Sequence, residues 1–260
     1  MDRKNIEKIA QTSDDKVLLA KVWDKIQAGI RKNIVSSTCF LSLRELEMTK
    51  YLFGNLPGLH AFGGYEDAER KMLVYLPDYF ENEDLPEQAP MVCLRAVFYE
   101  GDSPSHRDFL GALMGAGIAR ETVGDICVGK GSCDFFVTEE IAPYILQNFT
   151  GAGRTKLHLE QIDLKDVQVA QPEVKQIRDT LASMRLDGVI SSGFRVGRSQ
   201  AAQFVTSGRV AIDGLPCEKP DKVVCEGAKI SVRGLGKILL KSINGQTKKG
   251  RISVVIDRYV

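Results

Sequence analysis

The sequence lacks the cysteine and histidine patterns of a metal centre. It holds six cysteines and three histidines, and no two cysteines form a C-x-x-C pair that a histidine completes as a zinc site. The scattered positions also fit no disulfide framework of the kind that small secreted domains use. We therefore expect reduced thiols and no metal at Cys39, Cys93, Cys127, Cys133, Cys217 and Cys225.

Long apolar runs are also missing. No stretch approaches the roughly 18 consecutive apolar residues that a membrane-spanning helix requires. Residues 1–10 alternate charged with apolar side chains, whereas a signal peptide has a continuous apolar centre. These two absences predict a cytoplasmic protein without a membrane span.

The glycine-rich stretches lack the residues that complete a nucleotide site. Residues 124–131 (GDICVGKG) approach a phosphate-binding loop, yet Gly131 stands where that loop needs Ser or Thr. Residues 115–117 lack the third glycine of a dinucleotide fingerprint. His106 with Asp108 has the residue types of a general base and its orienting acid, but no nucleophile motif accompanies them. We expect no cofactor and no catalytic residue from these patterns.

Charge is distributed unevenly along the chain. Residues 182–260 hold 14 Lys and Arg against 6 Asp and Glu, a net charge of +8, whereas residues 1–181 hold 21 against 28, a net charge of −7. Lys and Arg neutralise phosphates in nucleic-acid interfaces independently of base sequence. The split predicts a nucleic-acid-binding module in the C-terminal third, and it leaves the acidic N-terminal region as a candidate surface for a protein partner.

Hydrophobic periodicity and turn signals predict a mixed α+β protein of three regions. The first region is mostly helical in pattern, with a capping box at Ser42 and Glu45 and a strand at residues 71–76. An acidic, proline-containing stretch at residues 81–90 indicates a linker. The predicted domains are residues 1–84, 85–170 and 171–260.

The middle region has the element order β-α-β-β-α-β of ferredoxin-like folds. RNA-recognition domains share this order and stack bases on aromatic residues of their central strands. Of the adjacent Phe135 and Phe136, one must face the core by strand alternation, which leaves the other as a candidate platform. The predicted strands are residues 91–99, 123–128, 133–137 and 155–162, and the predicted helices are residues 105–118, opened by a capping box at Ser105 and Asp108, and 138–149.

The last region predicts a compact α-α-β unit. Apolar residues recur at helical spacing from Val174 to Met184, which predicts a first helix that continues to Gly193. Arg178 and Arg185, seven positions apart, would share the other side of that helix. A second helix is expected at residues 198–207, followed by strands at 209–212, 229–233, 237–243 and 251–256, with a basic hairpin tip before the last strand.

The motif RLDGVISSGFRVGRSQAAQFVTSGRVAIDG, residues 185–214, resembles the two-helix signature of S4 RNA-binding domains. Together with FGGYEDAERKMLVYLP, HRDFLGALMGAGIARETVGDI and SVRGLGKI upstream and downstream of it, the chain is similar to the YlmH-type family. That resemblance implies an RNA-recognition-like domain followed by an S4 domain. It also implies a non-enzymatic protein that binds ribosomal RNA and tRNA on the large ribosomal subunit, in ribosome-associated quality control or rescue of stalled translation.

Asp187 raises an alternative from a different class. Arg185, Leu186 and Asp187 also match the aspartate motif of pseudouridine synthases, so the chain could be an RNA-modifying enzyme with an S4 targeting domain. A synthase aspartate, however, sits in a catalytic domain of its own, and Asp187 lies inside the S4 motif. We expect it to accept hydrogen bonds from the backbone or an arginine and to hold the two helices in register.

Two arginines lie where phosphate binding is favoured. Arg195 and Arg198 stand beside the start of the second predicted helix, where free N–H groups carry partial positive charge, although Gly197 is a weaker cap than the usual serine. The resemblance and the hairpin tip together imply RNA contacts at Arg185, Arg195, Arg198, Ser199, Gln203, Lys222, Arg233, Lys237, Lys248, Lys249 and Arg251. A second contact surface is expected at His106, Arg107 and Arg120.

Overall fold

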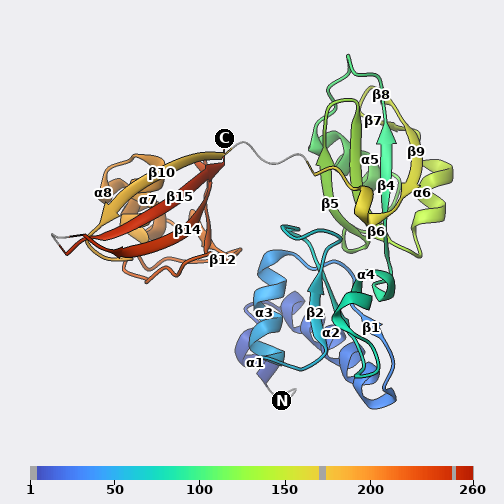
Figure 1. Cartoon of the computed structure of the whole chain (residues 1–260), viewed down its shortest axis with the longest axis horizontal. Coiled ribbons are helices and arrows are strands. Elements are labelled where there is room, and N and C mark those ends of the chain that lie inside the picture. Colours follow the sequence, from blue (N-terminus) through green and yellow to red (C-terminus); the bar gives the residue numbers. More distant parts are fainter. Residues whose placement is uncertain (1–4, 170–173, 248–249, 260) are drawn as a thin grey trace. The chain divides into compact units, whose positions relative to one another are not determined.

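The computed structural model describes residues 5–169, 174–247 and 250–259 of the chain. It divides into two compact units, Met1–Ala170 and Gln171–Val260, and each is described by itself (Figure 1). Helices and antiparallel sheets occur in both units, which confirms the predicted α+β class. The predicted boundary at residue 85 falls inside the first unit, and the three-domain division stays a prediction.

The N-terminal part of the first unit is helical, as predicted, with a small sheet in addition. Capping boxes open two of its helices, at Thr12 with Asp15 and at the predicted Ser42 with Glu45. Arg44 donates two hydrogen bonds of 2.7 and 2.6 Å to Asp15, which joins the two helices. The helices are α1 (Ile6–Ile9), α2 (Ser13–Lys32) and α3 (Leu43–Phe53), and β1 (Ser36–Ser37), β3 (Met72–Tyr75) and β2 (Leu59–Phe62) pair in that order.

A four-stranded antiparallel sheet forms the rest of the first unit. Its elements follow the predicted order: β4 (Met91–Val97), α5 (His106–Gly115), β5 (Val123–Val128), β6 (Ser132–Thr138), α6 (Ala142–Asn148) and β9 (His158–Ile162). The strands lie in the order β5-β6-β4-β9, so β9 is an edge strand. Residues 155 and 156 belong instead to a hairpin of β7 (Gly151–Ala152) with β8 (Thr155–Lys156). Short turns complete the unit at η2 (Asn82–Asp84), α4 (Leu85–Gln88), η3 (Arg120–Thr122) and η4 (Leu164–Asp166).

Both faces of this sheet are covered by the protein itself. Phe135 packs with the helix side of the sheet, in one core that includes residues of α5 and α6. Phe136 points to the other face and packs with Phe40, Met72 and Val74 of the N-terminal part. Phe135 and Phe136 are both 0% exposed, so the interpretation of either as a base-stacking platform is wrong. Strand alternation identified the two faces correctly, but the sequence did not show that the N-terminal part covers the second face.

The segment that follows β2 attaches the N-terminal part to this face of the sheet by hydrogen bonds. Asp125 of β5 accepts hydrogen bonds from the Tyr65 hydroxyl (2.8 Å) and from the backbone N–H groups of Glu69 (2.6 Å) and Arg70 (3.0 Å). The Tyr65 ring stacks on Phe136 with centroids 5.5 Å apart. Gly64 has a φ of +93°, and a Cβ there would lie 2.2 Å from the Phe136 ring, so only glycine fits.

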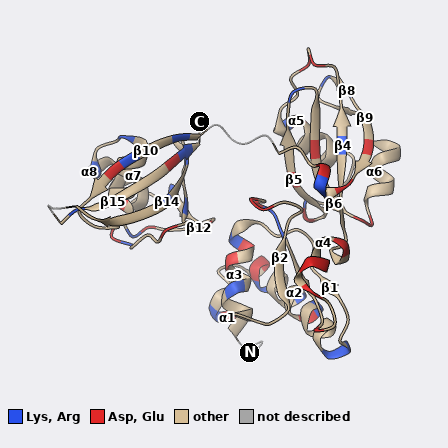
Figure 2. Cartoon of the chain, viewed as in Figure 1, with Lys and Arg blue, Asp and Glu red and all other residues tan. Residues whose placement is uncertain are grey.

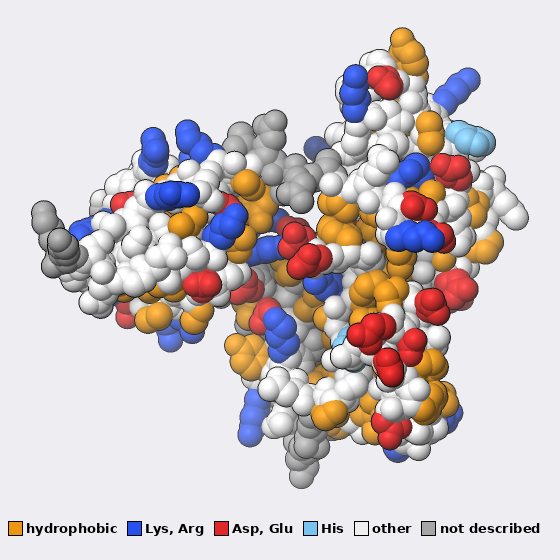
Figure 3. Space-filling view, in the orientation of Figure 1, with side chains coloured by type: hydrophobic (Ala, Val, Ile, Leu, Met, Phe, Trp, Pro, Cys, Tyr) orange, Lys and Arg blue, Asp and Glu red, His pale blue; other side chains and the backbone are white. Residues whose placement is uncertain are grey.

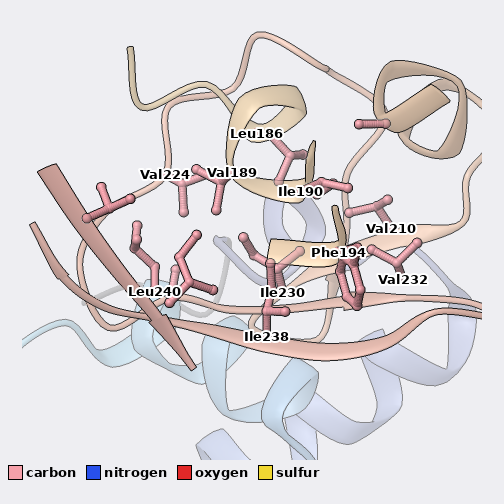
Figure 4. Close-up of a cluster of buried hydrophobic side chains, with 14 of the residues drawn as sticks. Leu186, Val189, Ile190, Phe194, Val210, Val224, Ile230, Val232, Ile238 and Leu240 are labelled. Carbon is pink, nitrogen blue, oxygen red and sulfur yellow. The ribbon is translucent and has the colours of Figure 1, made fainter. Parts of the chain in front are cut away.

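The second unit is a six-stranded sheet with two helices packed on it. Figure 4 shows Leu186, Val189 and Ile190 of the first helix directed toward Ile230, Ile238 and Leu240 of the strands. These apolar side chains are buried, and they form the core of the unit. The elements are β10 (Val174–Leu181), α7 (Leu186–Phe194), α8 (Arg198–Thr206), β11 (Val210–Ile212), β12 (Leu215–Pro216), β13 (Lys229–Val232), β14 (Gly236–Gln246) and β15 (Ile252–Tyr259), with the strand order β10-β15-β14-β13-β11-β12.

The predicted helix at residues 174–193 is wrong in its first half. Residues 174–181 form strand β10, which pairs antiparallel with β15 over its whole length, and helix α7 begins only at Leu186. The buried Ile177 and Leu181 are four residues apart. That spacing places two side chains on one face of a helix and equally on one face of a strand, so it does not separate the two structures. Arg178 and Arg185 therefore do not share a helix face.

Candidate nucleic-acid interface

The turn between α7 and α8 exposes two arginines. Arg195 ends α7 in the left-handed region with a φ of 55°, and the Ser191 hydroxyl closes the turn by donating to the Val196 carbonyl at 2.7 Å. Gly197 caps α8 without a side-chain hydrogen bond, as expected for glycine, so the first N–H groups of α8 have no side-chain acceptor on the cap residue. Arg198 is the first residue of α8. The turn thus brings Arg195 and Arg198 to the positively polarised end of a helix.

Asp187 lies beneath this turn and joins the two helices. Only 4% of the residue is exposed, and its carboxylate accepts from Arg185 (3.0 and 3.3 Å) and from Arg198 (3.2 Å). Burial by itself raises the pKa of Asp187, but the hydrogen bonds from the two guanidinium groups outweigh it and hold the pKa below its ordinary value. The expected pairing with arginine is confirmed, and one positive charge remains after the single carboxylate cancels the other.

A cleft of about 450 Å³ opens beside the same turn. Arg178, Arg195, Arg198 and Arg251 line it, and Asp179 is the one acidic residue among its described lining. Arg251 donates to the hydroxyl of Thr180 at 3.0 Å and to the carbonyl of the same residue. Arg178 donates to the side-chain carbonyl of Gln176 at 3.3 and 3.4 Å. These acceptors are neutral, so neither guanidinium loses its charge to them.

The structure brings together some of the predicted contact residues and leaves others apart. Arg195, Arg198 and Arg251 meet at the cleft, and Arg185 joins them through Asp187. The predicted residues that do not line the cleft are the exposed Ser199 and Gln203 on α8, the exposed Lys222 in the loop before β13, and Arg233 and Lys237 beside the turn from β13 to β14. Lys248 and Lys249 of the hairpin tip lie outside the described residues.

The residues of the second predicted surface lie near the two ends of helix α5. His106 and Arg107 are exposed at the start of α5. Arg120 follows the other end of that helix, and its guanidinium donates to the carbonyls of Val123 (2.5 Å) and Gly124 (3.4 Å). Burial also lowers the pKa of Arg120. Arg120 therefore braces the start of β5, and an RNA contact at His106, Arg107 and Arg120 stays a prediction.

Sequence reasoning missed the β10 wall of the cleft. Arg178, Asp179 and Thr180 line it, but a helix in this position would have placed them elsewhere. The signal was present in the β-branched residues Val174, Ile177 and Thr180, which favour a strand.

The two units carry opposite net charge. Residues 171–260 hold 16 Lys and Arg against 8 Asp and Glu, a net charge of +8, and residues 1–170 hold 19 against 26, a net charge of −7. Figure 2 marks acidic residues around α4 of the first unit and basic residues along β10 of the second. On the face of the second unit visible in Figure 3, several Lys and Arg side chains project close together. A surface of this sign attracts phosphate groups.

Two further findings concern what the described residues do not contain. None of the helices within residues 5–169, 174–247 and 250–259 has both the length and the apolar composition to cross a membrane. Over the same part of the chain, no group of three or more His, Cys, Asp or Glu residues is arranged to hold a metal ion.

Known proteins share both units. Residues 102–166 match the family model of the RNA-binding domain in YlmH, and residues 184–230 match the S4 domain. The ribosome-associated protein quality control protein P2 of Bacillus subtilis (strain 168) is 35% identical over 224 residues, which cover 85% of this chain and 86% of that protein. The solved structure of the cell division protein ylmH from Streptococcus pneumoniae shares the fold, with a TM-score of 0.51 at 18% sequence identity. The match covers 62% of this chain and 98% of that chain.

Proposed function

Because this chain belongs to the YlmH family, we propose that it is an RNA-binding protein of ribosome-associated quality control. In this proposal it binds ribosomal RNA and tRNA on the large ribosomal subunit in the cytoplasm, when translation has stalled. It acts as a clamp that holds tRNA in position while other factors act, and it catalyses no reaction of its own. The name of its Bacillus subtilis relative, ribosome-associated protein quality control protein P2, motivates the assignment to this process.

One observation carries the proposal: the arginines around the turn from α7 to α8. Arg195, Arg198 and Arg251 line one cleft in a unit with a net charge of +8. Guanidinium groups bind phosphate oxygens with two parallel hydrogen bonds, and a helix start adds partial positive charge. The competing reading as a pseudouridine synthase has no support in this arrangement, since Asp187 is buried and both of its oxygens accept from arginines.

The first unit contributes differently in this proposal. Its βαββαβ order and strand order support a ferredoxin-like, RNA-recognition-like domain. Because its outer sheet face is occupied by Phe40, Met72 and Tyr65, we place any RNA contact of this domain on its helices and loops. His106 and Arg107 are candidates for that contact, and the acidic surface of the unit is left for a protein partner.

Co-sedimentation with ribosomes tests the proposal. Cell lysate with the tagged full-length chain is separated on a sucrose gradient, and the fractions are probed for the chain. We expect it in the large-subunit fractions, and we expect Arg195→Glu with Arg198→Glu to move it to the top of the gradient. Repeating the gradient at higher salt should weaken the association, because counterions compete with the protein for phosphates.

A control with the same change in charge completes the test. Lys21→Glu with Lys25→Glu alters two exposed lysines of α2 in the first unit and should leave the sedimentation unchanged. If the wild-type chain never enters the ribosomal fractions, or if both double variants lose the association equally, the proposal is wrong.

A further inference from the structure

We infer that the cleft beside β10 is a binding site for a single unpaired RNA nucleotide. The inference rests on the proposed function, and it adds which structural class of RNA the second unit selects. The cleft lies between the free edge of β10 and the turn from α7 to α8.

The cleft combines two parts of the second unit. Gly188, Ser191 and Arg198 on one wall lie within residues 184–230, which match the S4 domain. Arg178 of β10 and Arg251 before β15 form the other wall and lie outside that match. The cleft is thus completed by strands that the S4 match does not include, and the S4 match alone does not account for it.

Shape argues for one nucleotide and against a duplex. Pockets for small organic ligands occupy about 300–1,000 Å³, and the cleft holds about 450 Å³. A nucleobase with its ribose is a ligand of this size. The backbone of an A-form helix is a broad convex surface that cannot enter such a cleft, whereas a nucleotide that is unstacked from a loop or bulge can be extended into it.

The residues that line the cleft offer groups suited to the phosphates and to the base of a nucleotide. Guanidinium groups at the rim, among them Arg195 and Arg251, suit the phosphates that flank one nucleotide, and a base can stack on the plane of a guanidinium group. Ile177, Leu181 and Ala182 add apolar lining. Asp179 supplies an acceptor for base N–H groups, and it is held in place by the Ser192 hydroxyl (2.7 Å) and the Thr180 N–H (2.7 Å).

One glycine allows the cleft to be filled without any change in charge. Gly188 lies within α7 and lines the cleft, and the nearest atom to a Cβ built there is the Ser183 carbonyl oxygen at 3.8 Å. A larger residue is therefore tolerated by the backbone, and it improves helix propensity over glycine. The side chain of Gly188→Leu would project into the space that the nucleotide is inferred to occupy. Ala182→Phe fills the cleft independently from the β10 side.

The experiment compares two RNA hairpins by fluorescence anisotropy with the full-length chain. One hairpin carries a single-nucleotide bulge, and the other is fully paired and matched in length and charge. We expect the wild-type chain to bind the bulged hairpin at least about tenfold more tightly. Gly188→Leu and Ala182→Phe should remove this preference while the affinity for the paired hairpin stays within about twofold. Gly111→Leu, the same substitution at an open position of α5, should retain the preference.

The outcomes separate this inference from the proposed function. Equal wild-type affinity for both hairpins overturns the nucleotide site and leaves the RNA-binding function standing. Retention of the preference in both filled variants also overturns the site. Failure of the wild-type chain to bind either hairpin overturns the proposed function, and the inference falls with it. If a free nucleoside monophosphate displaces the bulged hairpin at equal concentration, the cleft binds a small molecule and the inference is again wrong.

Discussion

The two units of this chain differ in which parts of their sheets are covered by other segments of the protein. In the first unit the outer face of the four-stranded sheet is covered by the protein's own N-terminal part, and Phe136 in that face is fully buried. In the second unit the edge strand β10 has one neighbouring strand, and its other side borders a cleft lined by arginines. The comparison teaches that an RNA-recognition-like element order does not locate the RNA surface, because other segments of the same chain can cover a face of the sheet.

Charge is used differently in the two units as well. In the first unit Arg95 and Asp134 form an ion pair with a 2.7 Å contact, in which the Asp134 side chain is 1% exposed. In the second unit Arg185 and Arg198 share the one carboxylate of Asp187, and 39% and 55% of their side chains are exposed. The first arrangement neutralises charge inside the fold, whereas the second holds two guanidinium groups in place and keeps them accessible to phosphate.

Phe136→Ala should give the largest effect on stability and tests the covered face. We expect the free energy of unfolding of the first unit to fall by about 3–5 kcal/mol, because the substitution empties space between two packed layers. RNA affinity should not change at a temperature where the variant remains folded. Urea denaturation and anisotropy measure the two quantities. Tyr99→Ala, which removes a side chain from a residue that is 77% exposed, is the matched control. A variant that loses RNA affinity with little loss of stability would restore the base-stacking interpretation.

Gly64→Ala tests how closely the segment that follows β2 packs against the sheet. Alanine must adopt a φ of +93° there, and its Cβ would lie 2.2 Å from the Phe136 ring. We expect a loss of at least about 2 kcal/mol in the free energy of unfolding, from backbone strain and overpacking together. Gly111→Ala, at a helical position with open space around it, should instead raise the stability by about 0.5–1 kcal/mol. Equal effects of the two substitutions would show that the turn does not press on Phe136.

Asp187→Asn should give the smallest change and tests the anchor in the second unit. We expect a loss of about 1 kcal/mol at pH 7, at the low end for charged hydrogen bonds because both arginines are partly exposed. The pKa of Asp187 is lower in the folded chain, so its contribution is present above the ordinary aspartate pKa and is lost as the pH falls below it. The difference between wild type and variant should therefore be constant from pH 7 to 5 and shrink below about pH 4. Calorimetry at several pH values measures it, and a difference that grows in acid contradicts the pairing.

The fold was predictable where local patterns have one solution. Capping boxes at Ser42 and Ser105 and the βαββαβ order are confirmed, because a cap residue and a period of two or of 3.6 each specify a local geometry. Strand β10 was not predictable from spacing alone, because Ile177 and Leu181 are compatible with both periods. What decides the structure there is the pairing with β15, a contact between residues about 80 positions apart in the chain.

The candidate site was predictable in its centre and not in its surroundings. The turn with Arg195 and Arg198 and the structural role of Asp187 follow from the sequence motif, and the structure shows both. Arg178 and Asp179 were missed because β10 was assigned to a helix. The bracing role of Arg120 was also missed, since the sequence does not show that carbonyls of its own chain accept from its guanidinium.

A matched pair of charge reversals tests most directly whether the second unit carries the RNA affinity. Arg195→Glu with Arg198→Glu alters the second unit, and Lys21→Glu with Lys25→Glu changes the charge equally at exposed residues of the first. Affinity for one structured RNA is measured against salt concentration for the full-length wild type and both variants. We predict that the first pair lowers the slope of log affinity against log salt by about two, one for each lost phosphate contact, and that the second pair leaves it unchanged. An equal or larger drop for the second pair would contradict this account.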